Sequence, residues 1–257
     1  AGVTIDVYVN VTLVGSGTTN KTGWVEFLDR MGREYCTFRA LWKNETVGSL
    51  TENVTGNLTE YVLQKTFYIG CELAHIEIAV IDESHPPQPL PFIKITLRSN
   101  KTGTLLFTTN YTGTIALNTF TNTSYTIEAR RYGYLFNTTL IENLTFALDI
   151  NITCPTYTIF AQVLDSKELS LQNVQVKVYE WGSERLMGSK VTNNLGSATF
   201  DCTFGRYTVR VYDLESGVIL NETIIDLIEN PLFFVIHCRI SNLDLSVVVK
   251  DYFEHSI

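Results

Sequence analysis

Three copies of one short segment decide the fold of this chain: Asn20-Lys21-Thr22-Gly23-Trp24-Val25-Glu26-Phe27, Asn110-Tyr111-Thr112-Gly113-Thr114-Ile115-Ala116-Leu117 and Asn193-Asn194-Leu195-Gly196-Ser197-Ala198-Thr199-Phe200. Their glycines are 90 and 83 residues apart, and each is followed 11 or 12 residues later by a tyrosine that opens another apolar stretch. Self-similarity at a fixed period of this size indicates an array of similar units.

The repeat is out of phase with the ends of the sequence. Asp82 and Asp165 each lie 31 residues before the glycine of their unit, and each closes a run of alternating apolar and polar residues. The corresponding run for Gly23 would fall before residue 1, whereas residues 243–251 repeat it with little chain behind them. We therefore expect a first unit that lacks its opening strand, and an opening strand near the C-terminus that lacks a unit.

Alternation with a period of two predicts strands with one buried face at residues 76–82 and 157–164. We expect the next strand of each unit at Val3/Ile5, Ile93/Ile95 and Val176/Val178. Further strands are expected at the three glycine segments and at 35–41, 66–73, 105–109, 125–131, 146–153, 186–192, 206–212 and 232–239. No stretch combines helical periodicity with caps. About seven short strands per unit predict an all-β fold of tandem Ig-like β-sandwiches. The expected domains are residues 1–74, 75–154 and 155–240, with 241–257 as an orphan first strand.

The motif resembles the prealbumin-like repeats, which include the carboxypeptidase-regulatory-like and Cna-B-type modules. The residues that carry the resemblance are Thr109–Leu117 with Tyr125–Ile127, and Thr192–Phe200 with Tyr207–Val209. The resemblance implies a spacer, a stalk or a polymerising subunit of a surface protein, similar to archaeal surface filaments or surface layers. Some Cna-B-type modules form a Lys–Asn cross-link, but the strands at 76–82 and 157–164 contain no lysine. We expect no such cross-link here.

Asparagine sequons indicate a secreted protein that carries N-linked glycans. Twelve of the 18 asparagines stand in Asn-x-Ser/Thr, several times the number that random placement would produce. The predicted acceptors are Asn10, Asn20, Asn44, Asn53, Asn57, Asn100, Asn110, Asn122, Asn137, Asn143, Asn151 and Asn221. Only Asn221 lies in the third unit, which indicates either that neighbouring molecules touch there or that the composition drifts along the chain.

The cysteines fit an oxidising compartment, although buried thiols are the alternative. Cys36 and Cys71 are separated by 35 residues, and Cys202 and Cys238 by 36, which predicts one disulfide in each of two units. The matching position in the middle unit is Thr119, so Cys154 is left without a partner or joins another chain.

Composition excludes several classes of function. The net charge is −8 and there is no basic run, which argues against binding to nucleic acid. No uncharged apolar stretch approaches 18 residues, so we expect no membrane span. The sequence has neither an initiator methionine nor a signal-like segment, which suggests a processed piece of an extracellular, cell-surface protein.

No constellation of residues indicates catalysis, a metal or a cofactor. The four histidines lack metal-ligand spacing, and catalytic or phosphate-binding motifs are absent. Acidic residues at strand ends, such as Asp82 and Glu83, are better explained as solvated turns than as a calcium site. We expect Trp24, Trp42 and Trp181 to be buried anchors rather than a sugar-binding platform.

The phase mismatch leads to a structural hypothesis. A sandwich without its first strand exposes a hydrophobic groove beside an unpaired edge, here an acceptor groove that includes Val3 and Ile5. The inward residues of the orphan strand, Leu243, Leu245, Val247 and Val249, have the pattern of the missing piece. We therefore predict head-to-tail donation between copies of the chain, which builds a filament. One alternative is a fragment of a longer tandem-repeat surface-layer or stalk protein, and another is a carbohydrate-binding or adhesive module.

Overall fold

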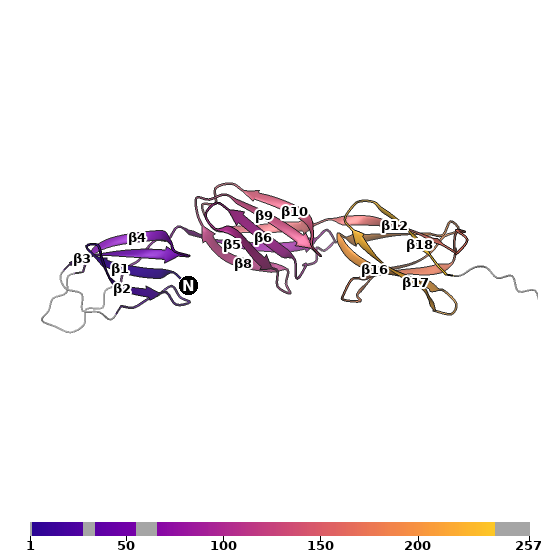
Figure 1. The fold of residues 1–257 in the computed structure, drawn as a ribbon, viewed down its shortest axis with the longest axis horizontal. Coiled ribbons are helices and arrows are strands. Elements are labelled where there is room, and N and C mark those ends of the chain that lie inside the picture. Colours follow the sequence, from indigo (N-terminus) through magenta and orange to yellow (C-terminus); the bar gives the residue numbers. More distant parts are fainter. Residues whose placement is uncertain (1, 28–33, 55–65, 240–257) are drawn as a thin grey trace, which may run out of the picture.

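The computed structural model describes residues 2–27, 34–54 and 66–239. All the regular secondary-structure elements within these ranges are β-strands. The strands form three bodies that follow one another in a row, with the first unit at one end and the third at the other (Figure 1). The all-β fold with tandem sandwich-like units, predicted from the alternation, is confirmed.

The middle unit consists of a four-stranded and a three-stranded sheet. The order in the larger sheet is β10 (Tyr134–Ile141), β9 (Tyr125–Arg131), β6 (Lys94–Ser99) and β7 (Gly103–Thr108); in the smaller it is β11 (Leu148–Cys154), β5 (Leu73–Asp82) and β8 (Thr114–Phe120). The opening strand β5 is central in its sheet: it runs antiparallel to β8 and parallel to β11. Alternate residues of β5, namely Ile76, Ile78 and Val80, are fully buried in the core between the sheets.

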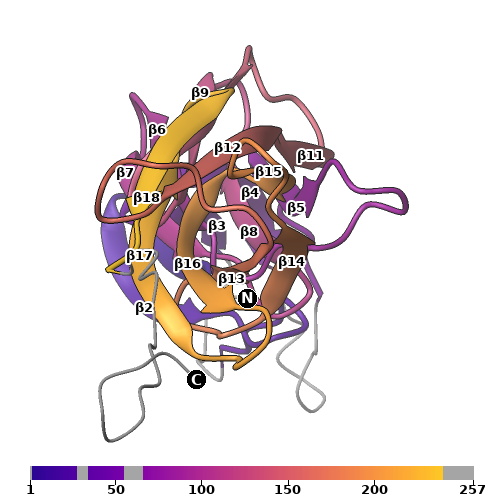
Figure 2. The same cartoon turned by 90° about the vertical axis from the view of Figure 1, so that its right-hand side faces the viewer.

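The third unit repeats this topology. Its four-stranded sheet has the order β14 (Leu186–Val191), β13 (Val174–Glu180), β16 (Gly205–Asp213) and β17 (Ile219–Leu227); its three-stranded sheet has β15 (Ser197–Thr203), β12 (Thr156–Leu164) and β18 (Leu232–His237). The opening strand β12 is again central, antiparallel to β15 and parallel to β18. Figure 2 looks onto this unit from its outer end.

The first unit differs from the other two. It has one four-stranded sheet, in the order β2 (Thr12–Thr18), β1 (Thr4–Val9), β3 (Glu34–Trp42) and β4 (Glu45–Val54). One face of this sheet buries Ile5, Val7, Phe38 and Ala40. Within the described residues of this unit there is no second sheet, and residues 24–27 and 66–70 are irregular.

The strand predictions hold where alternation is strong. Two of them are wrong: residues 24–27 and 66–72 form no strand, and the chain becomes regular again only at Leu73. Four strands, β2, β4, β10 and β17, were not predicted from the sequence, and all of them are edge strands of four-stranded sheets. An edge strand has one unpaired side and a weaker apolar pattern; β2, with two glycines, has no buried residue.

Candidate strand-acceptor groove

In the two complete units, the opening strand packs against the glycine turn of the repeated motif. The amide of Val80 donates to the carbonyl of Gly113 (2.9 Å), and the amide of Val163 donates to the carbonyl of Gly196 (2.8 Å). Both glycines have positive φ, and a Cβ on either would lie 2.8 Å or 2.6 Å from the carbonyl oxygen of Val80 or Val163. Only glycine therefore allows this close approach of turn and strand.

In the first unit the same turn is formed, but no strand among the described residues packs against it. The Oδ1 atom of Asn20 accepts hydrogen bonds from the amides of Thr22 (2.9 Å) and Trp24 (3.0 Å), as Asn110 and Asn193 do in their turns. Gly23 has a φ of +83°, but among the described residues no atom lies within 4 Å of where its Cβ would be. The turn is thus formed, and no residue of the described part of the chain occupies the place beside it.

Two irregular segments take the places of the strands that flank the opening strand in a complete unit. The repeat aligns Trp24–Phe27 with the start of β8, and residues 66–71 with the end of β11. Their inward side chains still pack on the four-stranded sheet: the Phe67 ring lies 4.9 Å from that of Phe38, and Val25 and Phe27 reach Gly17. Because the opening strand of a complete unit is central in its sheet, a strand at this place would pair on both sides, rather than at the single edge expected from the sequence.

An aromatic contact joins the outer sides of these two segments. The rings of Trp24 and Tyr68 meet edge to face, with centroids 6.4 Å apart. Trp24 is 53% exposed and Tyr68 is 82% exposed. The matching positions in the middle unit, Thr114 and Asn151, stand on either side of Ala79 in β5. In the middle unit the opening strand β5 therefore lies between the two matching residues. In the first unit the side chains of Trp24 and Tyr68 contact each other directly.

The predicted acceptor residues lie on or beside the inner face of the four-stranded sheet. Ile5 is buried within β1, and Val3, which precedes β1, is half-buried and packs against the same core. The predicted donor residues Leu243, Leu245, Val247 and Val249 lie outside the described residues.

The register contradicts the predicted disulfide between Cys202 and Cys238. Cys202 is opposite Tyr157 near the start of β12, whereas the amide of Cys238 donates to the carbonyl of Leu164 at the end of that strand. Seven residues of strand, at about 3.3 Å each, separate the two cysteines by roughly 23 Å. A disulfide requires Cα atoms less than about 7 Å apart. Both residues are buried thiols instead.

The predicted bridge between Cys36 and Cys71 is wrong for the same reason. Cys36 is opposite Glu52 on β4, but Glu72, next to Cys71, donates its amide to the carbonyl of Val47. Five residues of β4, or about 16 Å, lie between these two levels. The near-equal sequence spacings reflect the repeat and not proximity in space. Cys71 is exposed, whereas the matching Cys154 and Cys238 are buried.

The sequons lie on accessible parts of the described structure. None of the eleven described acceptor asparagines is buried; Asn57 lies outside the described residues. Asn10, Asn44, Asn122 and Asn143 have positive φ, as expected for turns. The side-chain amide of Asn221 differs, because its Nδ2 atom donates to the backbone carbonyl of His237 at 2.5 Å. A glycan replaces one of the two Nδ2 hydrogens, so this hydrogen bond restricts the orientation that a glycan on Asn221 could take.

The tryptophans are more exposed than expected. Only Trp42 is an anchor of the kind predicted: it is half-buried, and its ring contacts Phe120 of the middle unit at 5.0 Å. Trp24 and Trp181 are both exposed. Each packs edge to face against a tyrosine, Tyr68 and Tyr132 respectively, so the two tryptophans belong to different sites.

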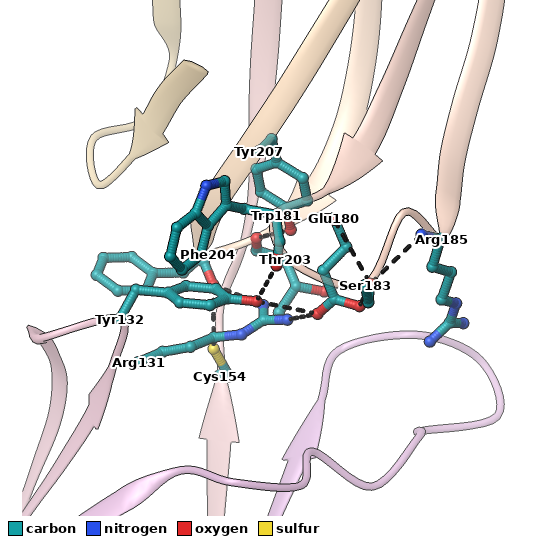
Figure 3. A network of polar contacts seen from close by, with 10 residues as sticks. All are labelled: Arg131, Tyr132, Cys154, Glu180, Trp181, Ser183, Arg185, Thr203, Phe204 and Tyr207. Atoms are coloured by element: carbon teal, nitrogen blue, oxygen red, sulfur yellow. Dashed lines mark hydrogen bonds and ion pairs between the residues drawn. The ribbon is translucent and has the colours of Figure 1, made fainter.

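A polar network joins the middle and third units (Figure 3). The buried Arg131, at the end of β9, donates to the carbonyl of Phe204 (2.7 Å) and to Oε1 of Glu180 (2.5 Å). Tyr132 extends the network to Glu180 (3.4 Å) and packs edge to face on Trp181. No local sequence pattern indicated this joint between the middle and third units, because its main ion pair links residues 49 positions apart.

A second set of contacts reinforces the same joint. The hydroxyl of Tyr134 donates to Oδ2 of Asp226 (2.8 Å), and Nε of Arg206 donates to Oδ1 (2.6 Å). The hydrogen bond from Arg206 holds the pKa of Asp226 below its ordinary value. Burial raises the pKa of Cys154, beside Phe204, to about 12, so this thiol stays neutral at physiological pH. The two complete units are thus held together by defined contacts and not only by the chain.

Among the described residues no three His, Cys, Asp or Glu side chains cluster as metal ligands do. The acidic residues at the end of β5 have structural partners: Asp82 accepts from the amides of Ser84 and Gln88, and Glu83 accepts from the amide of Thr156. In the part of the chain that the structure describes, no helix has the length and apolarity to cross a bilayer.

No protein-family model and no curated protein matches the chain. Among solved structures, the chain is similar to the Bacillus anthracis TIE protein, with 17% identity and a TM-score of 0.41 over 93% of this chain and 47% of that one. The chain therefore spans about half the length of that protein. It is also similar to GBS52, the minor pilin of Streptococcus agalactiae (12% identity, TM-score 0.34, 68% of this chain and 99% of that one).

A further similarity is to the shaft pilin SpaA of Lactobacillus rhamnosus GG, with 9% identity and a TM-score of 0.27 over 65% of this chain and 98% of that one. At these values the similarities carry no argument about function. None of these three organisms is an archaeon, so the comparisons give no support to the archaeal resemblance.

Proposed function

We propose that the chain is a non-enzymatic structural subunit of the cell surface that polymerises head to tail by strand donation. Residues 241–257 of one copy would complete the first unit of the next. The observation that carries this proposal is the place beside Gly23, which no described residue occupies, whereas the matching glycines of both complete units touch an opening strand there.

The complete units supply the register of the inserted strand. By analogy with β5, Val249 would donate its amide to the carbonyl of Gly23, as Val80 does to Gly113. Val247, matching Ile78, would lie between Val25 and Phe67, because Ile78 pairs with Ile115 on one side and with Ile150 on the other. The donor strand would then run antiparallel to one flanking segment and parallel to the other.

The energetics favour a strand that pairs on both sides. Four inward side chains contribute about 1.5–3 kcal/mol each, or roughly 6–12 kcal/mol before costs. Association and ordering cost about 4–15 kcal/mol, so burial alone does not ensure stable assembly. The two ladders of backbone hydrogen bonds that the donor strand would form with its two flanking segments therefore decide the affinity.

The positions of acceptor and donor suit an open polymer. The first unit and the end of β18 lie at opposite ends of the row of units (Figure 1). A contact between different surfaces of identical subunits extends indefinitely unless its rotation closes a ring. The accessible sequons support a glycan-coated filament outside the cell.

A second candidate is a piece of a longer tandem-repeat surface protein. In the described chain the opening strand follows closely on the preceding unit: only Pro155 separates β11 from β12. A unit preceding residue 1 would supply the missing strand covalently in the same way. The carbohydrate-binding candidate is weaker, because Trp24 and Trp181 lie at different sites and form no shared platform.

The decisive experiment deletes residues 241–257 and follows polymers by electron microscopy. We expect the truncated subunit to form no polymers and to bind a synthetic peptide of residues 241–257 with a stoichiometry of one. The matched control is the same peptide with Leu245→Asp and Val247→Asp, which should not bind because both positions face the core. Unchanged polymers, or equal binding of both peptides, would reject strand donation and favour the longer tandem protein.

A further inference from the structure

An apolar patch lies on the outer face of the small sheet in the third unit. Phe160 on β12 and Phe233 on β18 are in register, and their rings stack with centroids 4.7 Å apart and an interplanar angle of 9°. Val235 is the next outward residue of β18. The three side chains, which we call the phenyl patch, are 37%, 69% and 51% exposed.

The fold does not require this patch, because the middle unit has none. The repeat aligns Phe160 with Glu77, Phe233 with Asp149, and Val235 with the sequon residue Asn151, all of which are exposed. The same face of the same sheet therefore has acidic and glycan-accepting residues in one unit and apolar residues in the next. An exposed apolar cluster at positions that tolerate charge indicates an interaction surface.

The size and charge of the patch indicate its partner. The phenyl patch exposes on the order of 300 Å², well below the roughly 800 Å² that each partner buries in a stable complex. Contacts of this size hold molecules together when they recur along a polymer. Because every copy has the net charge of −8, an uncharged patch is the place where copies approach with least repulsion. The one sequon of this unit, Asn221, has its amide engaged with His237.

We infer that the phenyl patch of one polymer packs on the phenyl patch of a neighbouring polymer, so that filaments associate side by side. The contact is self-complementary: the same three side chains come from both copies around a local two-fold axis. This inference rests on the proposed polymerisation, since a single such contact holds two subunits only weakly and is detectable only at high subunit concentration.

The middle unit supplies the test substitutions. The triple variant Phe160→Glu, Phe233→Asp and Val235→Asn introduces the residues that this fold already carries at Glu77, Asp149 and Asn151, and it creates no new sequon. A matched control, Leu106→Glu with Leu140→Asp, adds the same charge to exposed apolar residues of the middle unit. Filament length is read by electron microscopy, and lateral association by the fraction of filaments that pellets at low speed.

We expect filaments of normal length in all three proteins. The triple variant should pellet at least about five-fold less than wild type, whereas the control should pellet like wild type. Raising the ionic strength should not disperse wild-type bundles, because the contact is apolar.

Three outcomes would overturn the inference: equal bundling of the triple variant and wild type, equal loss of bundling in the control, or bundles of the triple variant that disperse when free glycan is added. Wild-type filaments that stay single would also overturn it, because no neighbouring polymer would then cover the patch. If no filaments form, the proposed function fails instead. Sedimentation velocity of concentrated subunits then tests the contact separately: self-association in wild type but not in the triple variant supports it, and no difference rejects it.

Discussion

Replacing the three repeated glycines by alanine should separate stability from assembly. Gly113, Gly196 and Gly23 occupy the same turn with φ values of +71°, +72° and +83°. Their surroundings differ, because an added Cβ would meet the opening strand at Gly113 and Gly196, but no described atom within 4 Å at Gly23. The same chemical change should therefore have different consequences at the three sites.

The magnitudes follow from strain and contact. A left-handed conformation costs an L-residue about 1–2 kcal/mol, which applies to all three variants. At Gly113 the new Cβ would also lie 2.8 Å from the oxygen of Val80 and 2.9 Å from the nitrogen of Leu90. Backbone atoms cannot swing away, so this overpacking adds roughly 1–3 kcal/mol. We expect Gly113→Ala and Gly196→Ala to lose about 2–5 kcal/mol of unfolding free energy, and Gly23→Ala only the strain.

The cost at Gly23 should appear when the donor strand inserts. The carbonyl of Val249 would then occupy the place that the carbonyl of Val80 has beside Gly113. A penalty of about 1.4–2.8 kcal/mol on association corresponds to a ten- to hundred-fold rise in the critical concentration for polymerisation. Gly217→Ala is the matched control, because Gly217 has a φ of +70° and nothing described within 4 Å, and it lies outside the proposed groove.

Urea unfolding followed by tryptophan fluorescence measures stability, and sedimentation of polymers measures the critical concentration. The reasoning is refuted if Gly23→Ala polymerises like Gly217→Ala. It is also refuted if Gly113→Ala and Gly196→Ala are no less stable than Gly217→Ala, because the contact with the opening strand would then not affect the free energy of unfolding.

Three further predictions concern other parts of the chain. Cys71 should react readily with a thiol reagent in the isolated subunit and at least about ten-fold more slowly in the polymer, because the matching Cys154 and Cys238 are buried beside their opening strands; equal rates would contradict insertion. The pKa of Asp226 is lowered in the folded protein, so its stabilising effect is complete above its ordinary value near 3.8 and is lost as the pH falls through the lowered pKa. Thermal melts should therefore show a smaller loss of stability on acidification for Asp226→Asn than for wild type. Identical pH profiles would show that Asp226 does not stabilise the contact between the middle and third units. Peptide mapping by mass spectrometry should find glycans on exposed sequons such as Asn100 and Asn151 and at lower occupancy on Asn221, whose Nδ2 atom donates to His237.

The sequence alone determined the periodic features of this protein. Side chains alternate along each strand, so residues such as Ile76, Ile78 and Val80 reveal their buried face without knowledge of what covers them. The Asn-x-x-Gly turns are equally local, because the asparagine side chain bonds amides two and four residues ahead. The tandem sandwich-like units could therefore be predicted.

The tertiary structure alone decided which strands and side chains meet. Equal spacing of cysteines suggested bridges, but the register places Cys202 and Cys238 at opposite ends of β12. The ion pair of Arg131 with Glu180 and the stacking of Phe160 on Phe233 join residues 49 and 73 positions apart. Above all, the topology shows the opening strand at the centre of its sheet. Pairing between distant strands depends on the packing of the whole unit, and a local pattern along the chain does not encode it.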